Sequence, residues 1–244
     1  MHILLVVMIY IIGLGLNKES ISEEGKKILE KCDKVYIENY TVDFPYEIKV
    51  LEKYLDKKLN LANRDLVEGT SLIEEAKKKN IALLIYGSPL TATTHISLIQ
   101  EARKENVEYK IIYNASILDA VAETGLQLYK FGKVTSMPAW KKSFEPTSFM
   151  EIVKENIKIN AHSLILVDIG LKLNDAIKEL KESAKKQKVK IDKIVICSRM
   201  GTDEREIIYS ELGKIENKEI KKPYCIIIPG KLHFVEEEIL ADFS

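Results

Sequence analysis

The chain has 244 residues, of which 46% are hydrophobic and 30% charged. It is long enough for one large domain or two modest ones around a substantial core. Lys plus Arg and Asp plus Glu both number 37, and this neutral total argues against nucleic acid or an acidic membrane as the main partner. Three cysteines without a CxxC pair argue against a disulfide framework or a zinc site and predict a reducing cytoplasm.

The N-terminal segment Met1–Ile12 is strongly apolar. It lacks a basic leading region and a small-residue cleavage site, and Gly13 ends it too early to span a bilayer. We expect Met1–Val7 to be a short extension before a buried strand that starts near Met8. That Met8 is the true initiator is a hypothesis, which the intact mass of the native protein tests.

Short β-branched runs alternate with Lys- and Glu-rich segments that carry apolar residues at helical spacing. This alternation predicts an α/β architecture with largely parallel sheets. Ser22 is a candidate N-cap for one helix, and Asn174 is a possible cap for a helix that begins near Leu173. The runs that predict strands are Ile9–Gly13, Lys34–Glu38, Ile81–Tyr86, Lys110–Tyr113, Ser163–Ile169, Lys193–Cys197 and Tyr224–Ile228. The pattern breaks between Tyr113 and Pro138, which predicts two α/β domains, residues 8–114 and 115–244.

The segment Tyr86–His95 is the most informative turn. An apolar strand stops at Gly87 and Pro89, small and hydroxyl residues follow, and a helical pattern then begins. Such a turn exposes backbone amides at the carboxyl edge of a sheet, where α/β proteins bind small ligands.

A second turn, Gly13-Leu14-Gly15-Leu16, matches half of a dinucleotide fingerprint. Lys18 stands where the third glycine belongs, which makes a nicotinamide site a weak reading. Two readings remain: a tight turn after a buried strand, or a backbone that another ligand approaches closely.

Two further turns precede predicted helices. In Asn114–Ile117, Ser116 either caps the helix or holds a ligand carboxylate with its hydroxyl. His233, after the last apolar strand, is either structural or a ligand contact. The sequence contains no G-x-S-x-G, H-E-x-x-H or Walker lysine motif. This profile fits a transferase whose cofactor already carries an activated group.

These blocks together resemble the diphthine synthases, a family in the tetrapyrrole-methylase-like class of S-adenosylmethionine methyltransferases. Ala-Thr-Thr-His and Leu-Tyr-Lys-Phe-Gly are characteristic of that family rather than of the wider class. The matching blocks, in order, are Ile11–Leu16, Glu38–Thr41, Pro89–His95, Thr124–Gly132, Pro146–Phe149 and Pro229–Glu236.

The resemblance implies two α/β domains with the cofactor in the cleft between them, and usually a homodimer. It implies methyl transfer from S-adenosyl-L-methionine, with S-adenosyl-L-homocysteine as the product, to the amino nitrogen of a 3-amino-3-carboxypropyl-histidine on translation elongation factor 2, giving diphthine. No catalytic base and no metal are assigned. The cofactor contacts it implies are Leu16, Ser88, Thr91, Ser116, Ile117, Val167, Met200 and His233.

Two positions depart from the family pattern. Ser88 stands where the family usually has Asp, and Met200 stands where a small residue is common. Two rivals follow. One is a methyltransferase of the same class that acts on a small tetrapyrrole or corrinoid. The other, motivated by Ser88, is a non-catalytic protein that binds S-adenosylmethionine.

Overall fold

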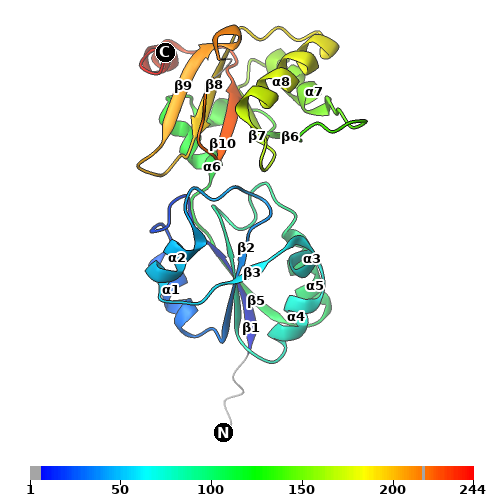
Figure 1. The fold of residues 1–244 in the computed structure, drawn as a ribbon, viewed down its shortest axis with the longest axis vertical. Helices are drawn as coiled ribbons and strands as arrows, with labels where there is room; N and C mark the ends of the chain where they lie inside the picture. The colour runs from blue at the N-terminus through cyan, green and yellow to red at the C-terminus, as the bar shows by residue number, and fades with distance from the viewer. Residues whose placement is uncertain (1–6, 216–217) are drawn as a thin grey trace. The chain divides into compact units, whose positions relative to one another are not determined.

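The computed structural model describes residues 7–215 and 218–244. They form two compact units, one ending at Ile117 and the other beginning at Leu118 (Figure 1). This division lies close to the boundary expected at residues 114 and 115. Each unit has its own five-stranded sheet, so the predicted α/β class is confirmed. The residues Met1–Val6 of the expected N-terminal extension lie outside the described part of the chain.

The sheet of the first unit is entirely parallel, in the order β3-β2-β4-β1-β5. The central strands are buried on both faces, which explains why they read as continuous apolar runs. β3 pairs with β2 at the edge and was not expected, because three residues are too few to show a period. The strands are β1 (Met8–Gly13), β2 (Lys34–Glu38), β3 (Asn60–Ala62), β4 (Ile81–Ile85) and β5 (Glu108–Ile112).

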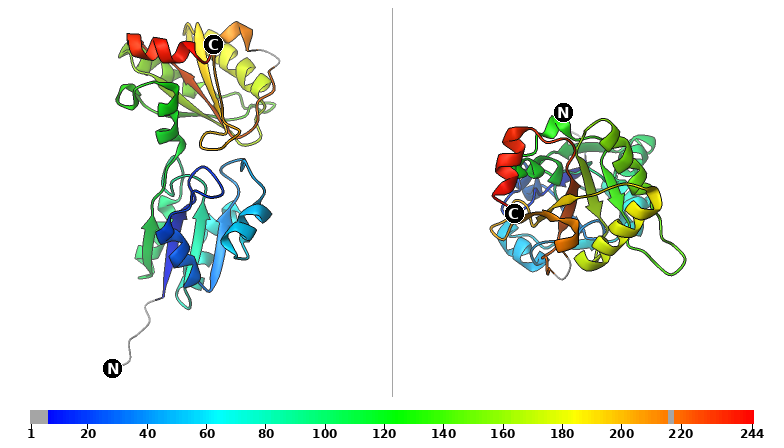
Figure 2. Two further views of the ribbon diagram at one scale, coloured as in Figure 1. Left: turned by 90° about the vertical axis from the view of Figure 1, so that its left-hand side faces the viewer. Right: turned by 90° about the horizontal axis from the view of Figure 1, so that it is seen from above.

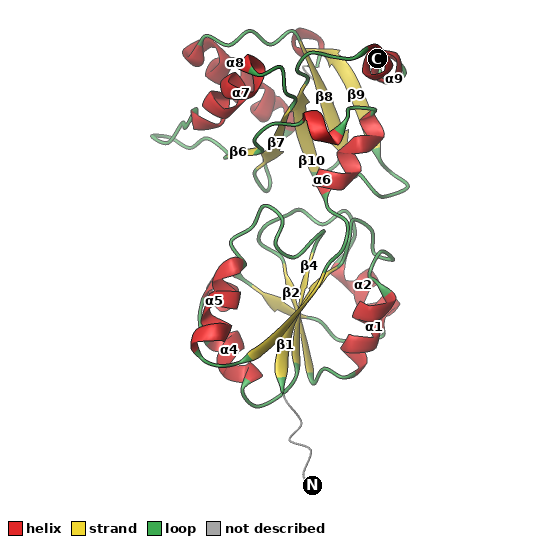
Figure 3. Ribbon diagram, turned by 180° about the vertical axis from the view of Figure 1, so that it is seen from behind, coloured by secondary structure: helices red, strands yellow, loops and turns green. Residues whose placement is uncertain are grey.

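Helices cover both faces of this sheet: α1 and α2 lie on one side and α3, α4 and α5 on the other (Figures 1 and 3). Ser22 caps α1 as predicted, since its hydroxyl accepts a hydrogen bond from the Gly25 amide at 3.0 Å. The helices are α1 (Glu23–Glu30), α2 (Ile48–Leu55), α3 (Arg64–Glu68), α4 (Ser71–Ala76) and α5 (Ile96–Lys104), and the short α6 (Ile117–Ala120) follows β5.

The sheet of the second unit has the order β6-β7-β10-β8-β9. Only β6 and β7 are parallel, and the other three pairings are antiparallel. The expectation of a largely parallel sheet is therefore wrong here, because an apolar run reports burial and not strand direction. The strands are β6 (Thr135–Met137), β7 (Ser163–Val167), β8 (Lys193–Ser198), β9 (Glu206–Glu211) and β10 (Tyr224–Ile228).

Seen from above, α7 and α8 pack on one side of this second sheet and α9 lies on the other (Figure 2). α8 begins at Leu173 as expected, but its N-cap is Lys172 and not Asn174. The helices are α7 (Ser148–Lys158), α8 (Leu173–Gln187) and α9 (Phe234–Ala241), with 3₁₀ turns η1 (Val121–Thr124), η2 (Leu128–Lys130) and η3 (Leu212–Lys214). Within residues 7–215 and 218–244, no helix is long and apolar enough to cross a membrane.

Candidate functional site

Two turns at the carboxyl edge of the first sheet are bonded to each other. The Gly15 amide donates to the Gly87 carbonyl at 3.1 Å, and the Gly87 amide donates to the Gly15 carbonyl at 2.9 Å. The hydroxyl of Tyr86 adds a hydrogen bond to the carbonyl of Leu16 at 3.0 Å. The turn after β1 and the turn after β4 therefore form one bonded layer.

The glycines of the turn after β1 serve the packing of the protein itself. A Cβ on Gly13 would lie 2.7 Å from the Gly87 carbonyl oxygen, and one on Gly15 would lie 2.6 Å from the Cβ of Ser20. Gly15 also has φ +71°, which favours glycine. Moreover, α1 starts only at Glu23, so no helix N-terminus stands where a dinucleotide site needs one. The tight-turn reading is therefore favoured over the nicotinamide reading.

The turn after β5 joins the same layer through Asn114. Its Nδ2 donates to the carbonyls of Gly13 at 3.1 Å and Ser20 at 2.8 Å. Its Oδ1 accepts the Ala115 amide at 2.8 Å. Ser116 follows and is buried, and a Cβ added to Gly87 would lie 3.9 Å from the Ser116 Cβ.

Five of the predicted contact residues belong to these three turns. Because β4, β1 and β5 are adjacent and parallel, their carboxyl ends meet at one edge. Leu16 is buried, and Ser88 and Thr91 are half-buried in a turn closed by a hydrogen bond from the Thr91 amide to the Ser88 carbonyl at 3.2 Å. The structure thus brings together Leu16, Ser88, Thr91, Ser116 and Ile117.

A buried carboxylate lies at the same edge, where β2 ends. Glu38 is fully buried. Its Oε1 accepts the amides of Tyr40 at 2.6 Å and Thr41 at 2.7 Å, and its Oε2 accepts the Thr41 hydroxyl at 2.7 Å. All three donors come from the next few residues, so this carboxylate shapes its own turn. No role for Glu38 follows from the sequence alone.

His95, from the Ala-Thr-Thr-His block, is also fully buried. Its Nδ1 lies 3.2 Å from the Pro89 carbonyl and 2.9 Å from the Thr93 hydroxyl. Because a carbonyl only accepts, we assign the proton to Nδ1. Nε2 is then an acceptor, and it lies 3.5 Å from the Tyr40 hydroxyl.

Both members of this pair are neutral near pH 7. Burial lowers the pKa of His95 against the opposing pull of Glu38. Burial, with the nearby Glu38 and Glu68 carboxylates, raises the pKa of Tyr40 to about 12.

In the second unit, Val167 and Met200 share one edge of the sheet. β7 ends at Val167, and β8 ends just before the turn Arg199-Met200-Gly201. Register pairs Leu166 with Cys225 and Ser198 with Tyr224, so the start of β10 lies at this edge too. Tyr224 is thus at this edge although the sequence analysis did not single it out. Met200 is 2% exposed, so its side chain belongs largely to the core.

His233 lies at the opposite edge of that sheet. It follows the end of β10, where Ile228 pairs with Ser163, the first residue of β7. Its Nδ1 accepts the Val235 amide at 3.4 Å, and its own amide donates to Glu236 at 2.8 Å, which completes a capping box on α9. The structure does not bring His233 together with Val167 and Met200. Capping residues and ligand contacts both occur at strand-to-helix turns, which is why the sequence left the two readings open.

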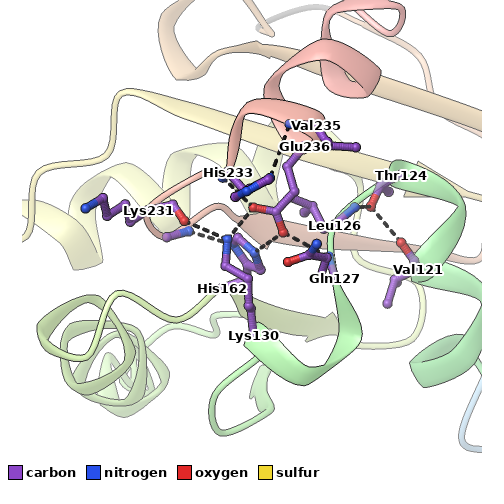
Figure 4. Close-up of polar contacts among 11 residues, drawn as sticks. Val121, Thr124, Leu126, Gln127, Lys130, His162, Lys231, His233, Val235 and Glu236 are labelled. Atoms are coloured by element: carbon purple, nitrogen blue, oxygen red, sulfur yellow. Dashed lines mark hydrogen bonds and ion pairs between the residues drawn. The ribbon is translucent and has the colours of Figure 1, made fainter.

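Glu236 is the centre of the network around this cap (Figure 4). It is fully buried and accepts from the Gln127 amide at 3.0 Å, His162 Nε2 at 3.1 Å, the His233 amide and the Lys130 ammonium. Burial raises the pKa of Glu236, but Lys130 and the other donors outweigh it and hold the pKa at about 2. The Leu-Tyr-Lys-Phe-Gly and Pro-Gly-Lys-Leu-His blocks therefore meet in a structural network.

The neutral tautomer of His162 follows from its second hydrogen bond. Its Nδ1 accepts the Gly230 amide at 2.9 Å, so Nε2 carries the proton that it donates to Glu236. Burial lowers the pKa of His162, against the opposing effect of Glu236.

The fold and the turns at the strand ends define the class. A family model described as Tetrapyrrole (Corrin/Porphyrin) Methylases matches residues 8–216. The chain is 38% identical to the diphthine synthase of Methanocaldococcus jannaschii, over 96% of this chain and 97% of that protein. It is 32% identical to the diphthine methyl ester synthase of Homo sapiens, over 97% of this chain and 95% of that protein.

A crystal structure of a diphthine synthase superposes with a TM-score of 0.88, at 30% identity over 97% of this chain and 96% of that one. The chain therefore belongs to the tetrapyrrole methylase family and, within it, to the group of the diphthine synthases. The predicted family resemblance and the predicted methyltransferase class are both confirmed.

Proposed function

We propose that the chain transfers methyl groups from S-adenosyl-L-methionine to the amino group of a 3-amino-3-carboxypropyl-histidine on translation elongation factor 2, giving diphthine. The observation that carries this proposal is the similarity to diphthine synthases along almost the whole chain. A small tetrapyrrole or corrinoid acceptor, which the name of the wider family suggests, has less support because the relatives reported above are named for diphthine.

The residues gathered at the first sheet suit the proposed cofactor. The hydroxyls of Ser88, Thr91 and Ser116 and the backbone amides of the turns are neutral donors and acceptors. Such groups match the ribose hydroxyls and the amino-acid end of an adenosyl donor, while Leu16 and Ile117 offer apolar surface. When bound, this donor supplies a methyl group already activated on a sulfonium.

Val167 and Met200 remain proposed contacts from the second unit. His233 is left out of the proposal, because its capping box on α9 accounts for it at the opposite edge of the sheet. We also propose, from the resemblance, that the protein is a homodimer and, from its three cysteines without a CxxC pair, that it works in the cytoplasm.

The reaction sets three demands on the chain. The acceptor amine must lose its proton, because only a free lone pair attacks a methyl carbon. The enzyme must also hold the two partners in line, which supplies a large part of the rate. The pocket must further admit an amine that already carries methyl groups.

Mass spectrometry tests the proposal. The chain is incubated with S-adenosylmethionine and elongation factor 2 that carries the unmethylated arm. The mass of the peptide that contains the modified histidine is then measured. We expect successive mass steps of one methyl group. Alkaline treatment removes only an ester methyl, and so separates diphthine from its methyl ester. Transfer of label to a tetrapyrrole and not to the factor would contradict the proposal, and so would the absence of cofactor binding in calorimetry.

A further inference from the structure

Glu38, Tyr40 and His95 are polar groups at the carboxyl edge of the first sheet to which no step has been assigned. We propose that the Tyr40 hydroxyl touches the substrate amine and takes up its proton, and that His95 positions Tyr40 and receives the proton from it. The inference rests on the proposed function and names residues for its proton transfer.

The position of Tyr40 and His95 fits the side of the proposed site at which the substrate amine would bind. β2 and β4 are parallel neighbours, with Ile37 opposite Leu84, so the turn with Tyr40 and the turn with Pro89 leave the sheet at the same edge. The turns proposed to hold the cofactor lie over β4, β1 and β5, whereas Tyr40 lies over β2, about 4.8 Å further along the sheet. The amine would therefore meet Tyr40 beside the Ser88–Thr91 turn.

The hydrogen-bond pattern fixes the direction of proton flow. Because His95 Nδ1 donates to Pro89, only Nε2 is left to accept, and the Tyr40 hydroxyl faces it at 3.5 Å. This is long for a hydrogen bond, and catalytic hydrogen bonds often tighten only when substrate binds. His95 is fully buried and Tyr40 half-buried, so Tyr40 is the member of the pair that reaches a ligand.

The charged groups around Tyr40 and His95 favour transient protonation of the His95 ring to an imidazolium. Glu38 at the end of β2 and Glu68 at the end of α3 both raise the pKa of His95 against the effect of burial. Glu68 is held in place by the Thr94 hydroxyl at 2.8 Å. The Arg64 guanidinium, which lies 4.0 Å from Glu68 on the same helix, is 5.2 Å from the centre of the Tyr40 ring, where it favours an electron-rich phenol oxygen.

An alkylammonium has a pKa of about 10, so the substrate arrives protonated. The Tyr40 oxygen takes a proton from the ammonium while its own hydroxyl proton passes to His95 Nε2. The freed lone pair forms the N–C bond, and the C–S electron pair stays on sulfur. When the acceptor leaves, His95 returns the proton through Tyr40 to water, and the next round begins from the same state.

The first test compares Tyr40→Phe with a control, Tyr54→Phe, which removes a hydroxyl on α2 that bonds Lys26. We expect the single-turnover rate of Tyr40→Phe at pH 7 to fall about 100-fold and to recover roughly tenfold per pH unit as water deprotonates the amine. Cofactor affinity by calorimetry should change less than about twofold. A rate loss that does not recover with pH, or a parallel loss of cofactor affinity, would overturn the inference and leave the proposed function standing.

The second test needs neither cofactor nor substrate. Nitrogen-15 spectra of the four histidines, with His95→Gln to assign the signal, should show His95 protonated on Nδ1. In Tyr40→Phe its pKa should rise, because the lost hydroxyl favours the neutral ring. A proton on Nε2 would refute the relay. If wild-type protein shows the expected tautomer but methylates no elongation factor 2, the proposed function fails on its own.

Discussion

Among residues 7–215 and 218–244, each unit buries one glutamate and one histidine completely, yet the two pairs are built differently. In the second unit, Glu236 accepts from four donors on three separate segments, and His162 is bonded through both ring nitrogens. In the first unit, Glu38 bonds only residues of its own turn. His95 is bonded at Nδ1 to Pro89 and Thr93, but its Nε2 has only a long, weak contact to Tyr40. A buried network in which every polar atom has a strong hydrogen bond stabilises one fold. A network that keeps a weak hydrogen bond at the edge of a sheet leaves a polar atom that a substrate can bind.

The largest expected effect tests this contrast directly. Glu236→Gln removes the charge that pairs with Lys130 and replaces an acceptor by a donor against buried amides, so it should lower the free energy of unfolding by about 3 kcal/mol. Glu38→Gln keeps one oxygen for the two backbone amides and should cost about 1 kcal/mol. Urea denaturation measures both, with the exposed Glu237→Gln as control. Equal losses would erase the distinction between the two networks.

As the pH falls, the folded state should lose stability first through His95 and His162 and then through Glu236. The pKa values of His162 and His95 are lowered in the folded state, so the unfolded chain binds more protons and stability falls once the pH drops below about 6.5. Glu236 has a folded pKa of about 2 against an ordinary value near 4.5. Its contribution, about 3 kcal/mol, is complete above pH 5 and is lost as the pH falls toward 2.

Denaturation curves from pH 8 to pH 3 measure this dependence. His162→Gln should flatten the fall between pH 6.5 and the pH at which Glu236 begins to titrate. A stability that rises as the pH is lowered through 6.5 would contradict the neutral, buried state of the two histidines.

Ser88→Asp tests whether the turn after β4 in the first unit binds the cofactor. The family pattern that the sequence resembles usually has Asp at this position, and a charged hydrogen bond is worth roughly 1.5–3 kcal/mol. The variant should therefore bind S-adenosylmethionine about tenfold more tightly in calorimetry. Ser88→Ala is the matched control and should weaken binding. Tighter binding by Ser88→Ala than by Ser88→Asp would remove this turn from the cofactor site.

The smallest expected change in stability distinguishes a helix cap from a ligand contact at His233. His233→Ala deletes the side-chain acceptor for the Val235 amide and should cost about 1 kcal/mol of stability, with cofactor affinity unchanged. His233→Asn, which keeps a capping oxygen, should restore most of the stability. A large loss of cofactor affinity in His233→Ala would return this residue to the binding site.

Local sequence patterns were sufficient for much of the fold. β-branched and apolar runs located seven of the strands to within about two residues, and the signal is continuous in central strands such as β4, which are buried on both faces. Ser22 was predictable from its hydroxyl and the acids that follow it. The turns after β1, β4 and β5 were predictable as neighbours at one edge of the sheet, because parallel strands place their carboxyl ends together.

Strand pairing decided the rest. The short β3 and β6 and the half-buried β9 leave weak patterns. Burial alone carries no information about strand direction, so the mostly antiparallel pairing in the sheet of the second unit was not predictable. For the same reason, the position of His233 could not be read from the sequence, since only the pairing of β10 with β7 shows which edge of the sheet it occupies. The contact between Tyr40 and His95, which are 55 residues apart, likewise depends on β2 lying beside β4. Only hydrogen bonding between these distant segments establishes that arrangement.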